Sequence, residues 1–303
     1  MNPKLSIIIV NWNTAKLLIN CLKSLEFEIR NLKFEIEIFV VDNGSTDNSV
    51  KEFKNFKFDS ENSFKIENLK LKIIENGTNM GFSRGNNVGI KQAKGEYIML
   101  LNSDTVIKEG AIEKLVRFLD EHPEVSIVGP RLLNQNSTFQ ANCGWFPLLR
   151  VAFLMLFKEH FGESDSVRFS PVKSQAVDWL MGAAFMARRE VFDKIGGLDE
   201  DIFMYMEEVE WFYRTKKQGF ITYFLKEAEI IHLGRGSSIT GKKEPIINIY
   251  KGLLHFYKKH RSKTEIIMLK LMLKLKALLT LIIGYLKKDA YLIETYGQAF
   301  KVS

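Results

Sequence analysis

Hydrophobic residues occur in short runs along the first half of the chain, and polar residues follow each run. Four runs rich in β-branched and aromatic residues have the length of buried strands and lie at residues 5–10, 35–41, 69–75 and 125–129. The longest segment covers residues 96–106, and its apolar run ends abruptly at Asn102, Ser103 and Asp104, which predicts a buried strand that ends there. Amphipathic stretches between the runs predict helices that end near residues 25, 56 and 94, and one over residues 109–121. This alternation predicts an α/β fold, with a mostly parallel central sheet flanked by helices.

The pattern changes after Pro130, and residues 131–177 show no regular spacing. Regular spacing returns after residue 177. It predicts a strand over 177–187, helices over 188–195 and 206–218, and strands over 220–225 and 229–233. Two longer helical patterns follow, at residues 245–260 and 264–286. The sequence therefore predicts a C-terminal helical extension on the α/β part.

Composition is that of a globular protein with a sizeable core: 46% of the 303 residues are hydrophobic and 26% are charged. The net charge of +7 is compatible with phosphate-rich ligands, an anionic membrane surface or nucleic acid. Cys21 and Cys143 have no metal-ligand spacing, which indicates free thiols in a reducing compartment. The amino-terminal residues do not have the pattern of a signal peptide, and no uninterrupted apolar run reaches the roughly 18 residues of a membrane span. We expect a cytoplasmic protein.

Polar residues stand directly after the predicted strands. Asn11 and Asn13 follow the first strand, and Asp42, Asn43 and Ser45 follow the second. A parallel sheet brings such strand ends to one edge, where ligands bind. The Asp42 carboxylate can accept an N–H from a pyrimidine base, whereas the alternative is ordinary turn chemistry.

The end of the longest run carries a candidate metal site. The Asp104 carboxylate and the Asn102 carbonyl are hard oxygen ligands suited to Mg²⁺ or Mn²⁺ on a phosphate. His232 also follows a predicted strand, and a neutral imidazole there either completes this site or has a structural role.

Residues 76–89 are rich in glycine and asparagine. Gly81 and Gly85 let the backbone approach a ligand closely, and Arg84 adds a positive charge. The glycine spacing differs from the dinucleotide-binding fingerprint, and the chain has no phosphate-loop lysine motif.

An acidic cluster at a predicted helix start is the candidate for proton transfer. Glu207 and Glu208 lie in the aromatic and apolar stretch MYMEEVEWFY, where carboxylates tend to have a raised pKa that suits a general base. The alternative is the favourable placement of acids at the positive end of a helix.

The last helical pattern, residues 264–286, is apolar with a stripe of lysines. Lys270 and Lys274 lie one helical turn apart. Such a helix either packs in the interior or lies on an anionic membrane surface.

Taken in order, these motifs resemble glycosyltransferase family 2. The matching segments span roughly residues 4–240 and read SIIIVNWN, VVDNGSTDNS, ENGTNMGFSRGNNVGI, GEYIMLLNSDTVI, WLMGAAFMARREVFDKIGGLDEDIFMYMEEVEW and IIHLGRGSS. Within the family, the chain looks most like the bacterial rhamnosyltransferase-like branch, whose acceptors are growing cell-surface glycans. The resemblance implies a GT-A fold over residues 1–240, with a nucleotide-sugar half (1–130), an acceptor and catalytic half (131–240), and a helical extension (241–303).

The resemblance also implies roles for individual residues. Asp104 and His232 would hold the Mg²⁺ or Mn²⁺ ion. Glu208 takes the place of the second member of the family's Glu–Asp pair, the usual base, and because Glu is longer than Asp, Glu207 stays a second candidate. The implied donor contacts are Asn11, Asn13, Asp42, Asn43, Ser45, Gly81, Phe82, Arg84, Asn86, Asn87, Asn102 and Ser103. The implied acceptor contacts are Trp179, Met181, Gly182 and Asp199.

The resemblance implies an inverting, metal-dependent transfer of a sugar, with rhamnose as a candidate. The donor would be dTDP-rhamnose or a UDP-sugar, and the acceptor a hydroxyl of a glycan or polyprenyl-linked molecule, with peripheral contact at the inner face of the cell membrane and no role for nucleic acid. Two other classes stay open. A nucleotidyltransferase would be expected to carry a glycine-rich basic loop after its first strand, which IIIVNWNTAK lacks. A non-catalytic sugar-nucleotide-binding protein is favoured only by Glu208 in place of Asp.

Overall fold

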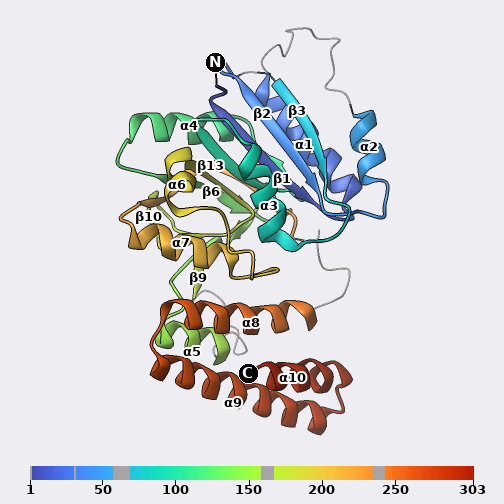
Figure 1. The fold of residues 1–303 in the computed structure, drawn as a ribbon, viewed down its shortest axis with the longest axis vertical. Helices are drawn as coiled ribbons and strands as arrows, with labels where there is room; N and C mark the ends of the chain where they lie inside the picture. Colours follow the sequence, from blue (N-terminus) through green and yellow to red (C-terminus); the bar gives the residue numbers. More distant parts are fainter. Residues whose placement is uncertain (1, 31, 57–68, 158–166, 235–242) are drawn as a thin grey trace.

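The computed structural model describes residues 2–30, 32–56, 69–157, 167–234 and 243–303, with an α/β part and a group of helices at one end (Figure 1). Up to residue 133 the elements are β1 (Leu5–Asn11), α1 (Ala15–Ile29), β2 (Ile36–Asp42), α2 (Ser49–Asn55), β3 (Leu69–Glu75), α3 (Gly81–Gln92), β4 (Tyr97–Asn102), β5 (Thr105–Ile107), α4 (Ala111–Glu121) and β6 (Ile127–Leu133). The later elements are β7 (Phe139–Gln140), β8 (Cys143–Gly144), α5 (Leu149–Phe157), β9 (Arg168–Phe169), β10 (Gln175–Ala176), β11 (Trp179–Leu180), β12 (Ala184–Arg188), α6 (Arg189–Ile195), α7 (Glu207–Lys217), β13 (Thr222–His232), α8 (Lys243–His260), α9 (Lys263–Lys287) and α10 (Ala290–Val302).

The central sheet has the order β10-β13-β6-β12-β4-β1-β2-β3, with β5 paired to β13 and β7 to β6. Strands β3, β2, β1 and β4 are parallel, as are β6 and β13, while β12 runs antiparallel between β4 and β6. The predicted, mostly parallel sheet is therefore confirmed. Its register places Asn11 beside Asp42 and Val10 beside Asn102, so the carboxyl ends of β1, β2 and β4 meet at one edge.

Helices cover both faces of this sheet. Side chains alternate along β1, so Ile7 and Ile9 pack in one core and Ile8 in the other. Apolar residues of α1 and α4 fill the first core, and those of α6 and α7 belong to the second. In helix α3, a Cβ added at Gly89 would lie 2.5 Å from Ile8 Cγ2, so glycine lets this helix lie directly on the sheet.

The C-terminal helices continue the second core. Phe256 of α8, Leu273 of α9 and Tyr296 of α10 are buried in the same cluster as Ile8. Tyr213 of α7 packs edge-on against Phe256, with 4.9 Å between the ring centroids. Helix α9 runs across the end of the molecule opposite the sheet (Figure 1). Among the described residues, none of the helices combines the length and the apolar character needed to span a bilayer.

Several predicted boundaries are wrong. The strand that begins near residue 96 ends at Asn102 as predicted, but a short strand that was not predicted, β5, follows it after a turn that the Thr105 hydroxyl closes by donating to the Asn102 carbonyl. The strand expected over 177–187 is divided into β11 and β12, whereas those over 220–225 and 229–233 form one strand, β13, with a register shift between Leu225 and Glu229.

Other elements were not predicted. Strand β6 continues through Pro130, because β12 pairs with it only at Ile127 and Val128 and needs no N–H from Pro130. The stretch expected to be irregular holds α5 and several two-residue strands, and α10 follows α9. The helix that ends near residue 94 was predicted, but as α3 it begins earlier than expected, at Gly81 within the glycine-rich stretch.

Candidate active site

The ends of β1 and β4 border a cavity of about 310 Å³, the strand-end cavity. Further wall comes from the start of α3, the residues around Met181 and Gly182, the start of α7 and the end of β13. The structure thus brings together predicted residues of every class around one space, namely Asn43, Gly81, Phe82, Asn102, Ser103, Asp104, Met181, Gly182, Glu207, Glu208 and His232. Cavities at strand ends of this kind are the usual ligand sites of open α/β sheets.

Asp104 and His232 face each other in this cavity. Asp104 lies in the turn between β4 and β5 and is only 6% exposed, and its Oδ1 is 3.4 Å from His232 Nε2. Nδ1 of His232 is 2.7 Å from Oε1 of Gln140, whose Nε2 donates to the His232 carbonyl. Nδ1 therefore carries a proton, and Nε2 is directed at the Asp104 carboxylate. An imidazole nitrogen and a carboxylate oxygen are both ligand types for divalent cations, so the pair can hold a cation between them.

Glu207 and Glu208 open α7 after a strained turn. Tyr205 and Met206 both have positive φ angles, 69° and 80°. Side chains other than glycine rarely occupy this region, and such strain concentrates at functional sites. Helix α8 packs on the turn at Gly252, where an added Cβ would lie 2.8 Å from Met206 Cβ and from the Tyr205 carbonyl oxygen. The turn thus holds both carboxylates at the cavity wall.

Both carboxyl groups are buried enough to resist ionisation. Burial raises the pKa of Glu207 well above its ordinary value, and the neighbouring Glu208 adds to the rise. Burial also raises the pKa of Glu208, against the opposing effect of backbone hydrogen bonds and of the Arg168 guanidinium. One oxygen of each, Oε2, is buried without a hydrogen-bond partner in the described part of the chain. Each group can therefore exchange a proton with a bound ligand.

Four predicted donor residues form a closed network beside the cavity. Asp42 accepts hydrogen bonds from Asn11 Nδ2 (2.9 Å), Ser45 Oγ (2.6 Å) and Ser45 N (2.9 Å). Asn13 receives the Thr46 backbone N–H on Oδ1 at 2.7 Å and donates its own N–H to Ser45 Oγ. These residues join the turns after β1 and β2.

Three predicted donor residues of α3 are not among the described residues that line the strand-end cavity. Asn87 is buried and clamps the loop before α7, because its side chain bonds both the N–H and the carbonyl of Leu198. Asn86 donates to the Phe82 carbonyl within the helix. Arg84 is half-exposed, with Nε 3.8 Å from Glu200.

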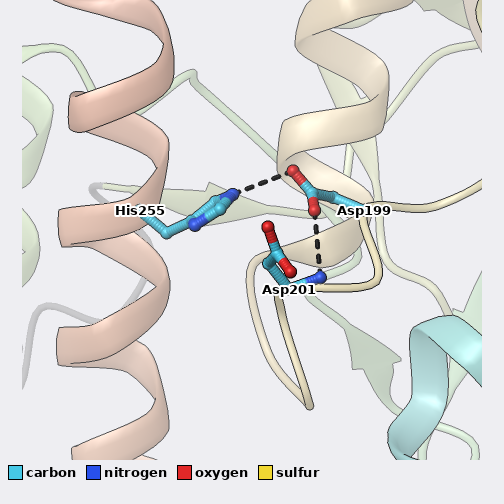
Figure 2. Close-up of side chains that lie close together, drawn as sticks. All are labelled: Asp199, Asp201 and His255. Atoms are coloured by element: carbon cyan, nitrogen blue, oxygen red, sulfur yellow. Dashed lines mark hydrogen bonds and ion pairs between the residues drawn. The ribbon is translucent and has the colours of Figure 1, made fainter.

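Asp199, predicted as an acceptor contact, belongs to a cluster with Asp201 and His255 (Figure 2). Ligand atoms of these three residues lie within 4.8 Å of one another, a spacing that could hold a metal ion. However, Asp199 Oδ2 accepts from His255 Nε2 at 2.8 Å and from Lys259 Nζ at 2.6 Å. Because an ammonium group already balances the carboxylate, we interpret the cluster as an ion-pair clamp between α8 and the loop before α7.

A second space, the apolar cavity, lies among α5, α7, α8, α9 and α10 and has a volume of about 270 Å³. Arg168, Tyr205 and Glu208 line both cavities, so the two spaces adjoin. Trp179, predicted as an acceptor contact, lines the apolar cavity. Its indole N–H donates to the Trp145 carbonyl at 3.0 Å.

Sequence reasoning missed several residues that line the cavities, among them Trp12, Arg168 and Tyr205. Trp12 lines the strand-end cavity, and its position in the sequence between Asn11 and Asn13, two predicted donor contacts, could have indicated this. Arg168 and Tyr205 line both cavities and carry no motif of their own.

Comparison with known proteins agrees with this geometry. The profile of glycosyl transferase family 2 matches residues 6–196, more than half of the chain. The chain belongs to this family.

The similar proteins include two that are named as sugar transferases. A low-salt glycan biosynthesis hexosyltransferase of Haloferax volcanii is 29% identical over 237 residues, which cover 72% of this chain and 63% of that protein. An N-acetylglucosaminyl-diphospho-decaprenol L-rhamnosyltransferase of Mycobacterium tuberculosis is 24% identical, over 65% of this chain and 66% of that protein. The chain thus spans about two thirds of the length of these two relatives.

The fold agrees with that of solved glycosyltransferases. A mannosyltransferase from Pyrobaculum calidifontis, solved with GDP-Man and Mn²⁺, superposes with a TM-score of 0.56 at 16% identity, covering 99% of this chain and 85% of that one. The fold is therefore the GT-A type, and the family is one of glycosyltransferases.

Proposed function

We propose that this glycosyltransferase is inverting and metal-dependent, and that it moves a sugar from a nucleoside-diphosphate sugar to a hydroxyl of a cell-surface glycan or lipid-linked acceptor. The observation that carries the proposal is the convergence of Asp104, His232 and Glu208 on the strand-end cavity. One cavity then holds a base, a cation site and the ends of the parallel strands.

Glu208 is the proposed base. It removes the proton of the acceptor hydroxyl, and the resulting oxygen attacks the anomeric carbon on the face opposite the nucleotide. A single displacement of this kind inverts the configuration. The exposure of Glu208 to both cavities favours it over Glu207, which is 5% exposed and is not among the described residues that line the apolar cavity.

Asp104 and His232 are the proposed ligands of Mg²⁺ or Mn²⁺. Their residue types fit such a cation, and Gln140 keeps the His232 ring in the required tautomer. When bound, the cation would neutralise charge on the leaving diphosphate. The Pyrobaculum calidifontis mannosyltransferase, which shares the fold and was solved with GDP-Man and Mn²⁺, supports this assignment.

The donor and acceptor assignments follow the position of each residue. Asn43, Gly81, Phe82, Asn102 and Ser103 line the strand-end cavity and are proposed to contact the donor. The network of Asn11, Asn13, Asp42 and Ser45 is proposed to shape the part of the site that receives the base. Arg84, Asn86 and Asn87 would then act through the position of α3 instead of by contact.

We also propose that the protein lies at the inner face of the cell membrane, bound through α9. One face of α9 packs on the core through Leu273 and Ala277. The opposite face exposes apolar side chains, including those of Met268, Leu271, Leu275, Leu278, Ile282 and Leu286. At about 100° per residue, Lys263, Lys270 and Lys274 border this face on one side. Apolar residues edged by lysines are typical of helices on anionic membranes.

A panel of sugar nucleotides tests the proposed activity. The protein is incubated with dTDP-rhamnose and with UDP-, GDP- and other dTDP-sugars, with and without Mg²⁺ or Mn²⁺, and release of nucleoside diphosphate is measured. We expect release from one class of donor, dependent on the cation. Release of pyrophosphate from nucleoside triphosphates would indicate a nucleotidyltransferase instead. Tight donor binding with no turnover on any acceptor would indicate a non-catalytic binding protein.

A further inference from the structure

The apolar cavity adjoins the proposed base. Glu208 lines both the apolar cavity and the strand-end cavity. An acceptor whose hydroxyl contacts Glu208 can therefore extend the rest of its structure into the apolar cavity. The far walls come from Val151 of α5, from Ile246 and Ile249 of α8, and from α9 and α10. These helices belong to the end of the molecule that carries the exposed face of α9 (Figure 1).

The lining of this cavity suits hydrocarbon better than sugar. Its wall contains Trp145, Val151, Leu156 and Ile246 among mostly apolar residues. A sugar placed there would leave hydroxyl groups without hydrogen-bond partners, which disfavours its binding. The volume of about 270 Å³ is near the lower limit of small-molecule pockets, about 300 Å³, so it accommodates a segment of a chain.

Two cationic side chains line the same cavity. Lys276 of α9 is 7% exposed, with Nζ 5.7 Å from the centre of the Phe157 ring. Arg168 stands where the two cavities meet, and its Nε is buried without a hydrogen-bond partner among the described residues. The Tyr250 hydroxyl of α8 is buried and unpartnered in the same way. A group rich in acceptor oxygens, such as a phosphate, would satisfy Arg168 Nε and the Tyr250 hydroxyl.

We propose that the apolar cavity binds the first segment of the hydrocarbon chain of a lipid-phosphate acceptor, with Arg168 contacting the phosphate and Glu208 contacting the sugar hydroxyl. This inference rests on the proposed glycosyl transfer and specifies its acceptor as a lipid phosphate. The occupant is the hydrocarbon chain of the acceptor, because the apolar cavity adjoins Glu208, the proposed catalytic base, and has cationic side chains in its wall.

Binding of farnesyl phosphate to the full-length protein tests the proposal without a transfer reaction. Calorimetry below the critical micelle concentration compares farnesyl phosphate with farnesol and with inorganic phosphate. We expect farnesyl phosphate to bind at least about tenfold more tightly than either, a gain of about 1.4 kcal/mol. Arg168→Met should reduce its affinity to that of farnesol. Equal affinities for farnesyl phosphate and farnesol in the unmodified protein would overturn the assignment of the phosphate.

Variants that fill the cavity test its location. Val151→Trp should weaken farnesyl phosphate binding by about tenfold or more. Val172→Trp is the matched control, because Val172 is 81% exposed and is not among the described residues that line the cavity. Ile246→Trp fills the cavity from α8 and serves if Val151→Trp has a lowered melting temperature. Retained affinity in a folded cavity variant would show that the chain binds elsewhere.

The two proposals can fail separately. Sugar transfer to a soluble glycoside without any binding of farnesyl phosphate would refute the lipid site and leave the transferase function intact. Cavity-specific binding of farnesyl phosphate without transfer from any sugar nucleotide would refute the proposed function and support the lipid site.

Discussion

At the residue scale, Asp104 and His232 give the metal hypothesis its sharpest test. Replacing Asp104 with Ala removes the carboxylate that faces His232 Nε2 at 3.4 Å. We expect metal-dependent donor affinity to fall at least about tenfold, since even outer contacts of a metal site are worth about 10–100-fold. Calorimetry with the donor, in the presence of Mn²⁺ and of a chelator, measures the difference. If the metal strengthens donor binding equally in the variant and the unmodified protein, Asp104 is not a ligand.

Glu208 determines the expected dependence of rate on pH. A base must be ionised, and its pKa is raised from 4.5, so kcat/KM should fall by about tenfold per pH unit below that raised value. Glu208→Gln should bind the donor normally but lose about 10²–10⁴ in kcat. Glu190→Gln, at the exposed first turn of α6, is the matched control and should keep its rate. Near-normal turnover of Glu208→Gln would exclude this residue as the base.

Glu207 is predicted to make stability depend on pH. Its pKa is raised in the folded state, so its contribution is complete below the unfolded pKa near 4.5 and is lost as the pH rises through the folded value. Glu207→Gln removes this loss. The variant should therefore melt a few degrees above the unmodified protein at pH 8 and equally at pH 4, since about 1 kcal/mol moves Tm by about 2–4 °C in large domains. A constant difference at both pH values would contradict the prediction.

At the scale of elements, the strained turn before α7 depends on α8. Gly252→Ala places a methyl group 2.8 Å from Met206 Cβ and from the Tyr205 carbonyl oxygen, closer than atoms can pack. The turn must then shift and displace Glu208, and even a displacement of about 1 Å can cost about 10²-fold in rate. We expect kcat to fall well beyond any loss of Tm.

Gly297→Ala is the matched control for this change. The added Cβ on α10 would lie 3.6 Å from Leu281 Cδ1, an ordinary contact. This variant should keep its activity and gain a little stability, because alanine favours a helix over glycine by about 1 kcal/mol. Equal loss of activity in both variants would show that the Tyr205–Met206 turn is not the sensitive feature.

Much of the α/β part could be predicted from the sequence, because its buried strands are continuous apolar runs with clear ends. Prediction failed where tertiary contacts define the element. Strand β13 holds together across its register shift through pairing with β6, and Pro130 is tolerated because β12 ends its pairing with β6 at Val128. The two-residue strands between residues 131 and 177 are too short to have a period of their own.

The candidate site was predictable where side chains follow a strand directly. Asp104 and His232 are separated by 128 positions, yet β13 pairs with β5 and brings them together. The glycine-rich stretch gave no signal of where its side chains point, because Gly81 starts a helix from which Asn87 reaches Leu198, and Asn87 is not among the described residues that line the strand-end cavity. Arg168 could not be found from sequence, since only the fold brings it beside Glu208.

At the scale of the whole molecule, the helices at one end are continuous with the core. Leu269, Leu273 and Ala277 of α9 are fully buried in the cluster that also contains Ile8 of β1. Deleting these helices would therefore expose the core, and loss of membrane binding after deletion could not be separated from unfolding. Point changes on the exposed face of α9 avoid this difficulty.

The membrane proposal predicts different effects on vesicle binding for the apolar residues of that face and for the lysines that border it. Leu271→Glu with Leu275→Glu should abolish cosedimentation with vesicles, because each change puts a charge among the apolar side chains that enter the lipid. Lys270→Gln with Lys274→Gln should weaken binding by about tenfold or more on anionic vesicles and little on neutral ones, since each lysine near the surface contributes about 1 kcal/mol. Val172→Glu, at an exposed site outside α9, should bind like the unmodified protein. An apolar face can also join two copies of the chain, and sedimentation velocity without lipid tests this alternative. If the unmodified protein is a dimer, the leucine changes dissociate it and vesicle binding is unchanged, α9 is an interface between two copies of the chain.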